Sequence, residues 1–202
     1  MPLTRGSTAK GQAGPDWSAT LKIGNKGKEA ASAGKLEIDK DAFTPVAHED
    51  FMRVDSLCSA ILLNFYEHLQ AEGLSAEDAT ELAKGADYFI RDFVVDFKAL
   101  NLFYELPGIV RQFAGNWYIS NTLEPDIGQL GGHLQGIRAF YRFLHERGFI
   151  SAAYLEAIEN ESSDLAYYER RIETFWEIEG DGFIAWEAEC TLKEGNAKPG
   201  RA

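Results

Sequence analysis

The stretch HLQGIRAFYRFLHERGFI, residues 133–150, constrains the fold of this chain more than any other part of it. Apolar side chains recur there at three- and four-residue steps, which is the spacing of one face of an α-helix. Phe140 and Phe143 widen this face, and its other members are Leu130, Leu134, Ile137, Tyr141 and Leu144. We therefore expect the central helix of a helical domain, ending at Gly148.

The opposite face of this helix carries four polar side chains: Gln135, Arg138, Arg142 and His145. Helical spacing places them together, and the neighbouring aromatic residues could order them against a protein partner or a nucleic-acid backbone. A solvated face with an ion pair between Arg142 and Glu146 explains the same pattern. The sequence leaves both interpretations open.

The charge of the chain is divided unevenly. The net charge is −12, but residues 1–40 hold seven Lys or Arg against four acids, whereas residues 41–202 hold 13 against 28. The first segment is thus +3 and the remainder −15. An acidic body repels phosphate backbones, which argues against general nucleic-acid binding but leaves room for a local basic patch.

The two cysteines and the N-terminal region bear on the cellular compartment. Cys58 and Cys190 both lie in apolar-periodic segments, so we expect buried thiols rather than a disulfide scaffold. The N-terminus lacks the apolar region of a secretory signal, and no run approaches 18 apolar residues. We therefore expect a cytoplasmic protein that does not enter a membrane.

Further helices surround the central one in the predicted domain. Apolar periodicity indicates helices over about 48–72 and 75–100, from Pro107 onward, and from Ser151 onward with a break near the run NESSD. The central helix begins at Pro125 or only near Gly132, and the run FIAWEAECTLK forms a short helix or a strand. The fold class that follows is an all-α bundle of five or six helices.

Three segments result from this pattern: a flexible, mildly basic tail at 1–44, the helical domain at 45–192, and a frayed C-terminus at 193–202. The tail is rich in Gly, Ala, Ser and Lys, so it cannot bury enough apolar surface to offset its ordering entropy. It serves as a solubilising or connecting segment, or it holds nucleic acid or an acidic partner.

Three runs within residues 79–150 suggest a family: YFIRDFVVDFKAL, the helix that ends in WYISNTLEP, and above all GIRAFYRFLHERGFIS. Together they resemble the SAM-like, core-binding N-terminal domain of tyrosine recombinases and phage integrases. The resemblance implies a small bundle with orthogonal helical packing that grips DNA from one side. Arg138 and Arg142 would then face DNA. The residues after Ile150 are too few for the catalytic domain of those enzymes, so the resemblance concerns this module alone.

A second segment, EIEGDGFIAWEAE at residues 177–189, resembles a degenerate EF-hand calcium loop. Acids stand at loop positions one, three and five, which are Glu177, Glu179 and Asp181, and Gly182 stands at position six. Position twelve, usually a bidentate Glu, is Ala188. The resemblance implies weak calcium binding, whereas a Gly-Asp-Gly turn on an acidic surface explains the same residues without a metal.

No pattern of catalytic residues stands out in the chain. There is no P-loop, no dinucleotide-binding glycine fingerprint and no nucleophile in a local motif. None of the histidines completes the Glu-x-x-His pattern that di-metal sites in bundles use: His48, His68, His133 and His145. We therefore expect no catalytic residues and no cofactor beyond weakly bound calcium.

The leading functional hypothesis is a non-enzymatic protein-interaction or regulatory module with an unidentified protein partner. It rests on residues 151–194, which hold 12 acids against three Lys or Arg, and on four aromatic residues: Tyr167, Tyr168, Trp176 and Trp186. One alternative is the DNA-binding module that the recombinase resemblance implies. Another is an enzyme whose dispersed active site the sequence does not reveal. The oligomeric state does not follow from the sequence.

Overall fold

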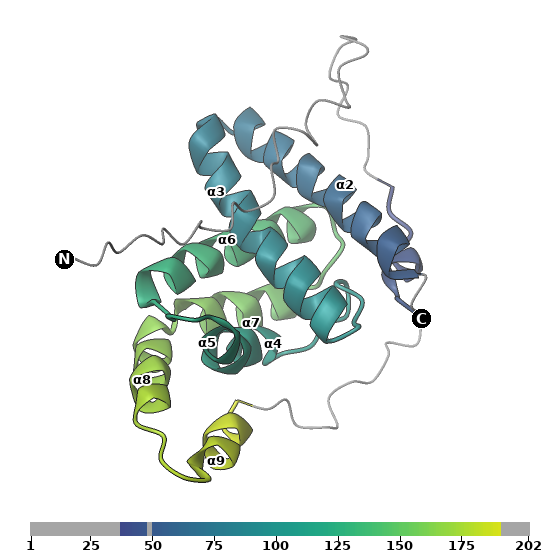
Figure 1. The fold of residues 1–202 in the computed structure, drawn as a ribbon. Helices are drawn as coiled ribbons and strands as arrows, with labels where there is room; N and C mark the ends of the chain where they lie inside the picture. The colour runs from purple at the N-terminus through teal and green to yellow at the C-terminus, as the bar shows by residue number, and fades with distance from the viewer. Residues whose placement is uncertain (1–36, 48–49, 191–202) are drawn as a thin grey trace, which may run out of the picture. The chain divides into compact units, whose positions relative to one another are not determined.

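A computed structural model describes residues 37–47 and 50–190, and these residues form an all-helical domain without a strand (Figure 1). The predicted all-α fold class is therefore confirmed. None of the helices in this described part is long and apolar enough to cross a membrane. The elements are η2 (Asp41–Phe43), α2 (Asp50–Ala71), α3 (Ala76–Asp87), η3 (Tyr88–Phe97), α4 (Ile109–Gln112), η4 (Phe113–Trp117), α5 (Tyr118–Asn121), α6 (Ile127–Glu146), α7 (Ala152–Ser163), α8 (Leu165–Trp176) and α9 (Gly182–Ala188).

Local capping sets several helix starts where the sequence places them. The Ser75 hydroxyl accepts the backbone N–H of Asp78 at 3.0 Å and begins α3, and Ser151 begins α7 in the same way. The Asp126 carboxylate accepts the N–H of Gln129 at 2.8 Å. Helix α6 therefore starts just after Pro125 rather than near Gly132, which decides between the two predicted starts.

Helix α6 is the central element, as its apolar face predicts. It packs against α3, α7 and α8, and Figure 1 shows α3 crossing it. Two glycines allow this crossing. A Cβ added to Gly136 would lie 2.9 Å from the Cα of Gly85 on α3, which is closer than real Cβ contacts. Glycine is a poor helix former, but at position 136 the close approach of α3 requires it.

Two segments depart from the predicted α-helices. Residues predicted as one helix over 75–100 form α3 and then the π-helical segment η3, and the helix after Pro107 is interrupted by the π-helical segment η4. The two segments lie against each other in an aromatic cluster, in which the Phe93 and Trp117 rings are 5.4 Å apart. π-Helical turns are uncommon, and here both π-helical segments take part in one apolar contact.

The predicted break near NESSD lies at Asp164, between α7 and α8. The break places Glu161, near the end of α7, against the start of α4. Its buried carboxylate accepts the backbone N–H groups of Gly108, Val110 and Arg111 at 2.6–3.0 Å. These are donors that the first turn of a helix leaves without an intrahelical partner, so α7 caps α4.

The predicted tail of 1–44 is too long at its C-terminal end. Phe43 is 4% exposed and its ring packs edge-on against Phe103 at 5.0 Å. The Asn101 amide donates to the carbonyl of Lys40 at 2.7 Å, and the Lys40 ammonium donates to the carbonyl of Phe149 at 2.7 Å. Residues 37–44 therefore belong to the helical domain. The rest of the predicted tail and the predicted frayed end at 193–202 lie outside the described residues.

Candidate functional site

The four polar residues predicted to share one face of α6 do not form a free basic surface. Arg142 is exposed, but its Nε lies 2.6 Å from a carboxylate oxygen of Glu159 on α7 rather than beside Glu146. Arg138 is half-buried, and its buried Nε has no hydrogen-bond partner among the described residues. Gln135 is exposed and His145 is half-buried. The ion pair between Arg142 and Glu146, which the sequence left open as one interpretation of this face, does not form among the described residues.

The segment predicted as a degenerate calcium loop spans two elements. Glu177 directly follows α8, Asp181 directly precedes α9, and residues Gly182–Ala188 are helical. Gly180 takes the left-handed backbone at φ 59°, while the expected turn residue Gly182 does not. Within the described part of the chain, the three predicted ligands do not belong to a group whose ligand atoms all lie within 4.8 Å of one another. Calcium binding by them stays a prediction.

The aromatic residues predicted to face a partner are divided between core and surface. Tyr168 and Trp186 are buried, and Tyr167 is half-buried with its hydroxyl 3.0 Å from the Cys190 sulfur. Trp176 is 61% exposed. Phe183 and Ile184, which the sequence analysis did not single out, are 38% and 73% exposed on α9.

A run of ring contacts links the exposed Trp176 to Phe183 on α9. Trp176 contacts Phe175 at 5.5 Å, Phe175 contacts Trp186 at 5.2 Å, and Trp186 stacks on Phe183 at 5.9 Å between ring centroids. We call Trp176, Phe183 and Ile184, with the exposed carboxylates of the same stretch of chain, the C-terminal surface. The carboxylates belong to Glu173, Glu177, Glu179, Asp181 and Glu187.

One buried arginine fixes α9 in place. Arg171 is 3% exposed, and its guanidinium lies over the Trp186 ring at 3.7 Å. It donates to the carbonyl of Trp186 at 2.7 Å, to the carbonyl of Gly115 at 2.9 Å, and to the Glu189 carboxylate at 2.9 Å. Gly115 lies within η4, so this arginine ties α8, α9 and a π-helical segment together.

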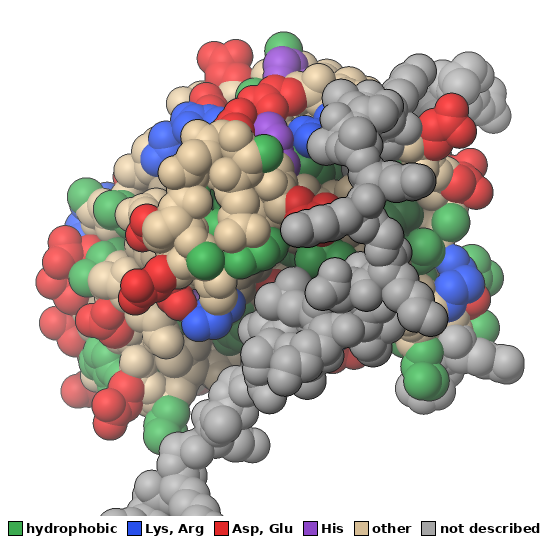
Figure 2. Space-filling view, turned by 90° about the horizontal axis from the view of Figure 1, so that it is seen from above, with side chains coloured by type: hydrophobic (Ala, Val, Ile, Leu, Met, Phe, Trp, Pro, Cys, Tyr) green, Lys and Arg blue, Asp and Glu red, His purple; other side chains and the backbone are tan. Residues whose placement is uncertain are grey.

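Acidic side chains dominate the surroundings of this surface. From Asp164 to Cys190 the chain has eight acids and two arginines, and one of those arginines is the buried Arg171. Figure 2 shows the face seen from above, where acidic side chains, in red, are also more frequent than basic ones, in blue. The C-terminal surface therefore combines exposed apolar side chains with exposed carboxylates of the same segments.

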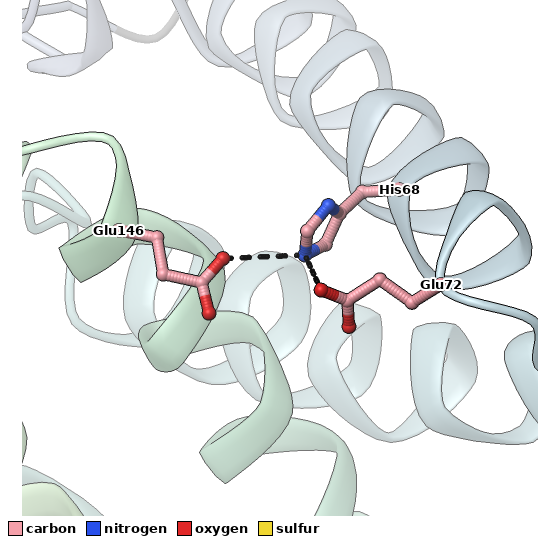
Figure 3. Close-up of side chains that lie close together, drawn as sticks. All are labelled: His68, Glu72 and Glu146. Atoms are coloured by element: carbon pink, nitrogen blue, oxygen red, sulfur yellow. Dashed lines mark ion pairs between the residues drawn. The ribbon is translucent and has the colours of Figure 1, made fainter.

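A second group of polar side chains lies at the ends of α2 and α6. His68, Glu72 and Glu146 converge there, with both carboxylates directed at the imidazole Nε2 (Figure 3). The sequence analysis missed this group because it sought ligands at local spacings. His68 lies in the last turn of α2 and Glu72 follows four residues later, directly after the helix, which is a local signal. Glu146 comes from a distant part of the chain.

No family model, curated protein or solved structure matches this chain. The likeness of residues 79–150 to recombinase core-binding domains stays an expectation from the sequence.

Proposed function

We propose that this domain is a protein-interaction module whose C-terminal surface binds a basic, apolar segment of a partner protein. The observation that carries the proposal is the exposure of Trp176 and Ile184, at 61% and 73%, in a segment that also exposes five carboxylates. Large apolar side chains that are exposed among charged ones are typical of interaction sites. Tryptophan is also among the residues that contribute most to binding energy.

The chemistry of the partner follows from the surface. Its exposed apolar side chains offer aromatic and aliphatic contacts, so a partner needs apolar side chains that lose contact with water on binding. Its carboxylates attract Lys and Arg and repel acidic chains, which accelerates association with a basic partner and weakens it in high salt. A basic amphipathic helix combines both properties in one short segment.

The packing beneath the surface supports a fixed binding face. Arg171 and the ring of Trp186 hold α9 against α8. The Asn116 side-chain amide adds a bond to the carbonyl of Glu187 at 3.3 Å. A face that is already ordered loses less conformational entropy when a partner binds, so affinity is higher for the same contacts.

The contact between Arg142 and Glu159 supports a protein partner over the DNA-binding alternative. A DNA-facing arginine needs its guanidinium available to phosphate, whereas this one is paired with a carboxylate from α7. The net charge of −15 over residues 41–202 adds a general repulsion of DNA.

The proposal can be tested with a fluorescently labelled synthetic peptide that places Leu and Lys at helical spacing. Fluorescence anisotropy should report saturable binding to the full chain, with an affinity that falls as salt is added. The double variant Trp176→Ala with Ile184→Ala should weaken binding by about tenfold or more, because it removes exposed apolar side chains of this surface.

A matched control removes exposed apolar side chains elsewhere. Leu123 is 91% exposed and Met52 is 82% exposed, and neither lies in α8 or α9. The double variant Leu123→Ala with Met52→Ala should bind the peptide like the unmodified chain. The proposal fails if the peptide does not bind, or if both double variants weaken binding equally.

A further inference from the structure

We propose that His68, Glu72 and Glu146 form a binding site for a first-row divalent cation such as Zn²⁺, between the C-terminal ends of α2 and α6 (Figure 3). The site lies apart from the C-terminal surface and does not depend on the function proposed above. One imidazole nitrogen and two carboxylates form a mixed nitrogen and oxygen ligand set, which suits such ions.

The backbone brings the three residues to one place. His68 lies in the last turn of α2, and the backbone N–H of Glu72 donates to its carbonyl at 3.0 Å, which places both side chains on one side of the helix. Glu146 is the last residue of α6. Gly73 and Gly148 follow in the left-handed conformation, at φ 97° and 73°, and turn the chain away from both helix ends.

Aromatic packing holds the two helix ends together. The buried rings of Phe65 on α2 and Phe143 on α6 have centroids 5.5 Å apart. The imidazole of His68 lies against the same Phe143 ring at 5.3 Å. The imidazole therefore has a packed position, and only the two carboxylates must adjust to a cation. This is the kind of support from surrounding residues that an ordered metal site requires.

The distances fit ligands around an ion better than hydrogen bonds. The Nε2 atom of His68 lies 3.4 Å from a Glu146 oxygen and 3.6 Å from a Glu72 oxygen, which is long for hydrogen bonds. One N–H shared between two acceptors at such distances gives only weak hydrogen bonds to both. Zinc–ligand bonds of about 2.1 Å separate neighbouring ligand atoms by roughly 3.4 Å in a tetrahedral site. All three ligand atoms lie within 4.8 Å of one another, so small carboxylate rotations would complete the set.

The electrostatic surroundings contain excess negative charge. The C-terminal end of a helix carries a partial negative charge and disfavours carboxylates, yet two helices place Glu72 and Glu146 at such ends. Arg147 is the cationic neighbour, and its guanidinium lies over the Phe143 ring at 3.8 Å. A divalent cation would offset the negative charge that remains at the ligands.

Exposure of the site leaves room for exchange with solvent. The His68 side chain is 18% exposed, and those of Glu72 and Glu146 are 54% and 53% exposed. Three protein ligands on one side of an ion leave at least one position for water, so the cation would be accessible from solution.

Isothermal titration of the full chain with zinc chloride at neutral pH tests the proposal. We expect one saturable site. His68→Gln and Glu146→Gln should each weaken it by more than about tenfold, because each removes a ligand. Arg147→Gln should tighten it, because a positive charge leaves the neighbourhood. Added zinc should also raise the thermal midpoint of the unmodified chain and have little effect on the two ligand variants.

Two variants control for adventitious binding to an acidic protein. Glu67→Gln removes an exposed carboxylate one residue before His68, and His145→Gln removes an imidazole one residue before Glu146. Both should bind zinc like the unmodified chain, and circular dichroism should show native helix content in every variant. Absence of saturable binding overturns the proposal, as does a zinc affinity that His68→Gln and Glu146→Gln leave unchanged.

Discussion

Asp87 is a carboxyl group whose surroundings favour its protonated form. It is 9% exposed at the end of α3, and burial raises its pKa to about 6. The Arg91 guanidinium, with Nη1 3.3 Å away, opposes this effect, while Asp92 and Asp55 add to it. Arg91 is shared with Asp55, whose carboxylate lies 2.7 Å from its Nε, so it does not fully compensate the Asp87 charge.

This environment predicts a stability that depends on pH. The folded protein holds the Asp87 proton more tightly than the unfolded chain does, and this difference stabilises the fold. The stabilisation is complete below about pH 4 and is lost as pH rises through about 6. The side chain of Asp87→Asn cannot titrate. Between about pH 4 and 6 the free energy of unfolding of the unmodified chain should therefore fall by about 1–3 kcal/mol more than that of the variant.

Urea unfolding at several pH values between these limits measures the effect. Glu67→Gln, which alters an exposed carboxylate, should follow the unmodified chain. If the free energies of unfolding of Asp87→Asn and the unmodified chain change with pH in parallel, the folded protein does not bind the Asp87 proton more tightly than the unfolded chain does.

At the scale of residues, the sequence predicted contacts that are local and missed those that are not. The Ser75 and Ser151 caps were predictable because donor and acceptor lie three residues apart. For Arg142 the sequence left open a partner one helical turn away, but its partner is Glu159 on the next helix. The convergence of Glu146 on His68 depends on how α2 and α6 pack, which periodicity does not specify.

Two glycines of α6 differ in the space around them: one lies where α3 crosses the helix, and the other does not. At Gly136, an added Cβ would lie 2.8 Å from the backbone nitrogen of Ala86 and closer still to the carbonyl oxygen of Leu82. At Gly132, an added Cβ would meet nothing within 4 Å. Backbone atoms cannot rotate away as side chains do, so only the first position excludes alanine.

Alanine substitutions separate these two roles. Gly136→Ala should destabilise the domain by about 1–3 kcal/mol, because α3 and α6 must move apart. Gly132→Ala should leave stability unchanged or raise it by up to about 1 kcal/mol, because alanine is the better helix former. Chemical denaturation of both variants provides the comparison. Equal effects of the two substitutions would refute the close crossing.

At the scale of elements, the sequence predicted where helices lie but not their π-helical turns. The apolar positions Phe89, Phe93 and Phe97 fit an α-helical face equally well, so periodicity does not distinguish the two forms. In η4 the carbonyl of Gly115 receives the Nε–H of Arg171. That donor is 56 residues away along the chain, so a tertiary contact supports the local geometry.

The whole domain begins earlier than composition indicates. Residues 37–44 are mostly polar and charged, so composition alone does not assign them to a core. The burial of the aromatic Phe43 shows that they pack against the domain. The compact unit that holds the described helices also starts at Glu37. A composition shift therefore identified a boundary near the right place but could not assign the segment that contains Phe43.

Two truncations test this boundary. A chain that begins at residue 45 should be less stable than a chain that begins at residue 37, by about 3 kcal/mol. The longer truncation removes a buried phenylalanine and the bond from Asn101 to the Lys40 carbonyl. Thermal unfolding of the two proteins measures the difference. Equal midpoints would show that residues 37–44 do not contribute to the fold.

At the same scale, the candidate sites were predictable in part. Counting charges identified the acidic C-terminal third, and the structure adds which of its aromatic residues face solvent. Tyr168 and Trp186 resemble surface residues in sequence because they lie among acids, yet both are buried. The Tyr168 hydroxyl donates to a carbonyl at the end of α7, and Arg171 donates to the carbonyl of Trp186. Charge composition identifies an acidic region, but the tertiary packing decides which side chains a partner can reach.

The positions of the two thiols make them chemical reporters of two different motions. Cys58 is fully buried in α2, where burial raises the pKa of its thiol to about 12, so an alkylating reagent reaches it only when the core opens. Cys190 follows α9, with its sulfur beside the Tyr167 hydroxyl and the backbone of Gly115. Detachment of α9 alone would expose that sulfur. The ratio of the two alkylation rates therefore separates the opening of one peripheral helix from unfolding of the domain.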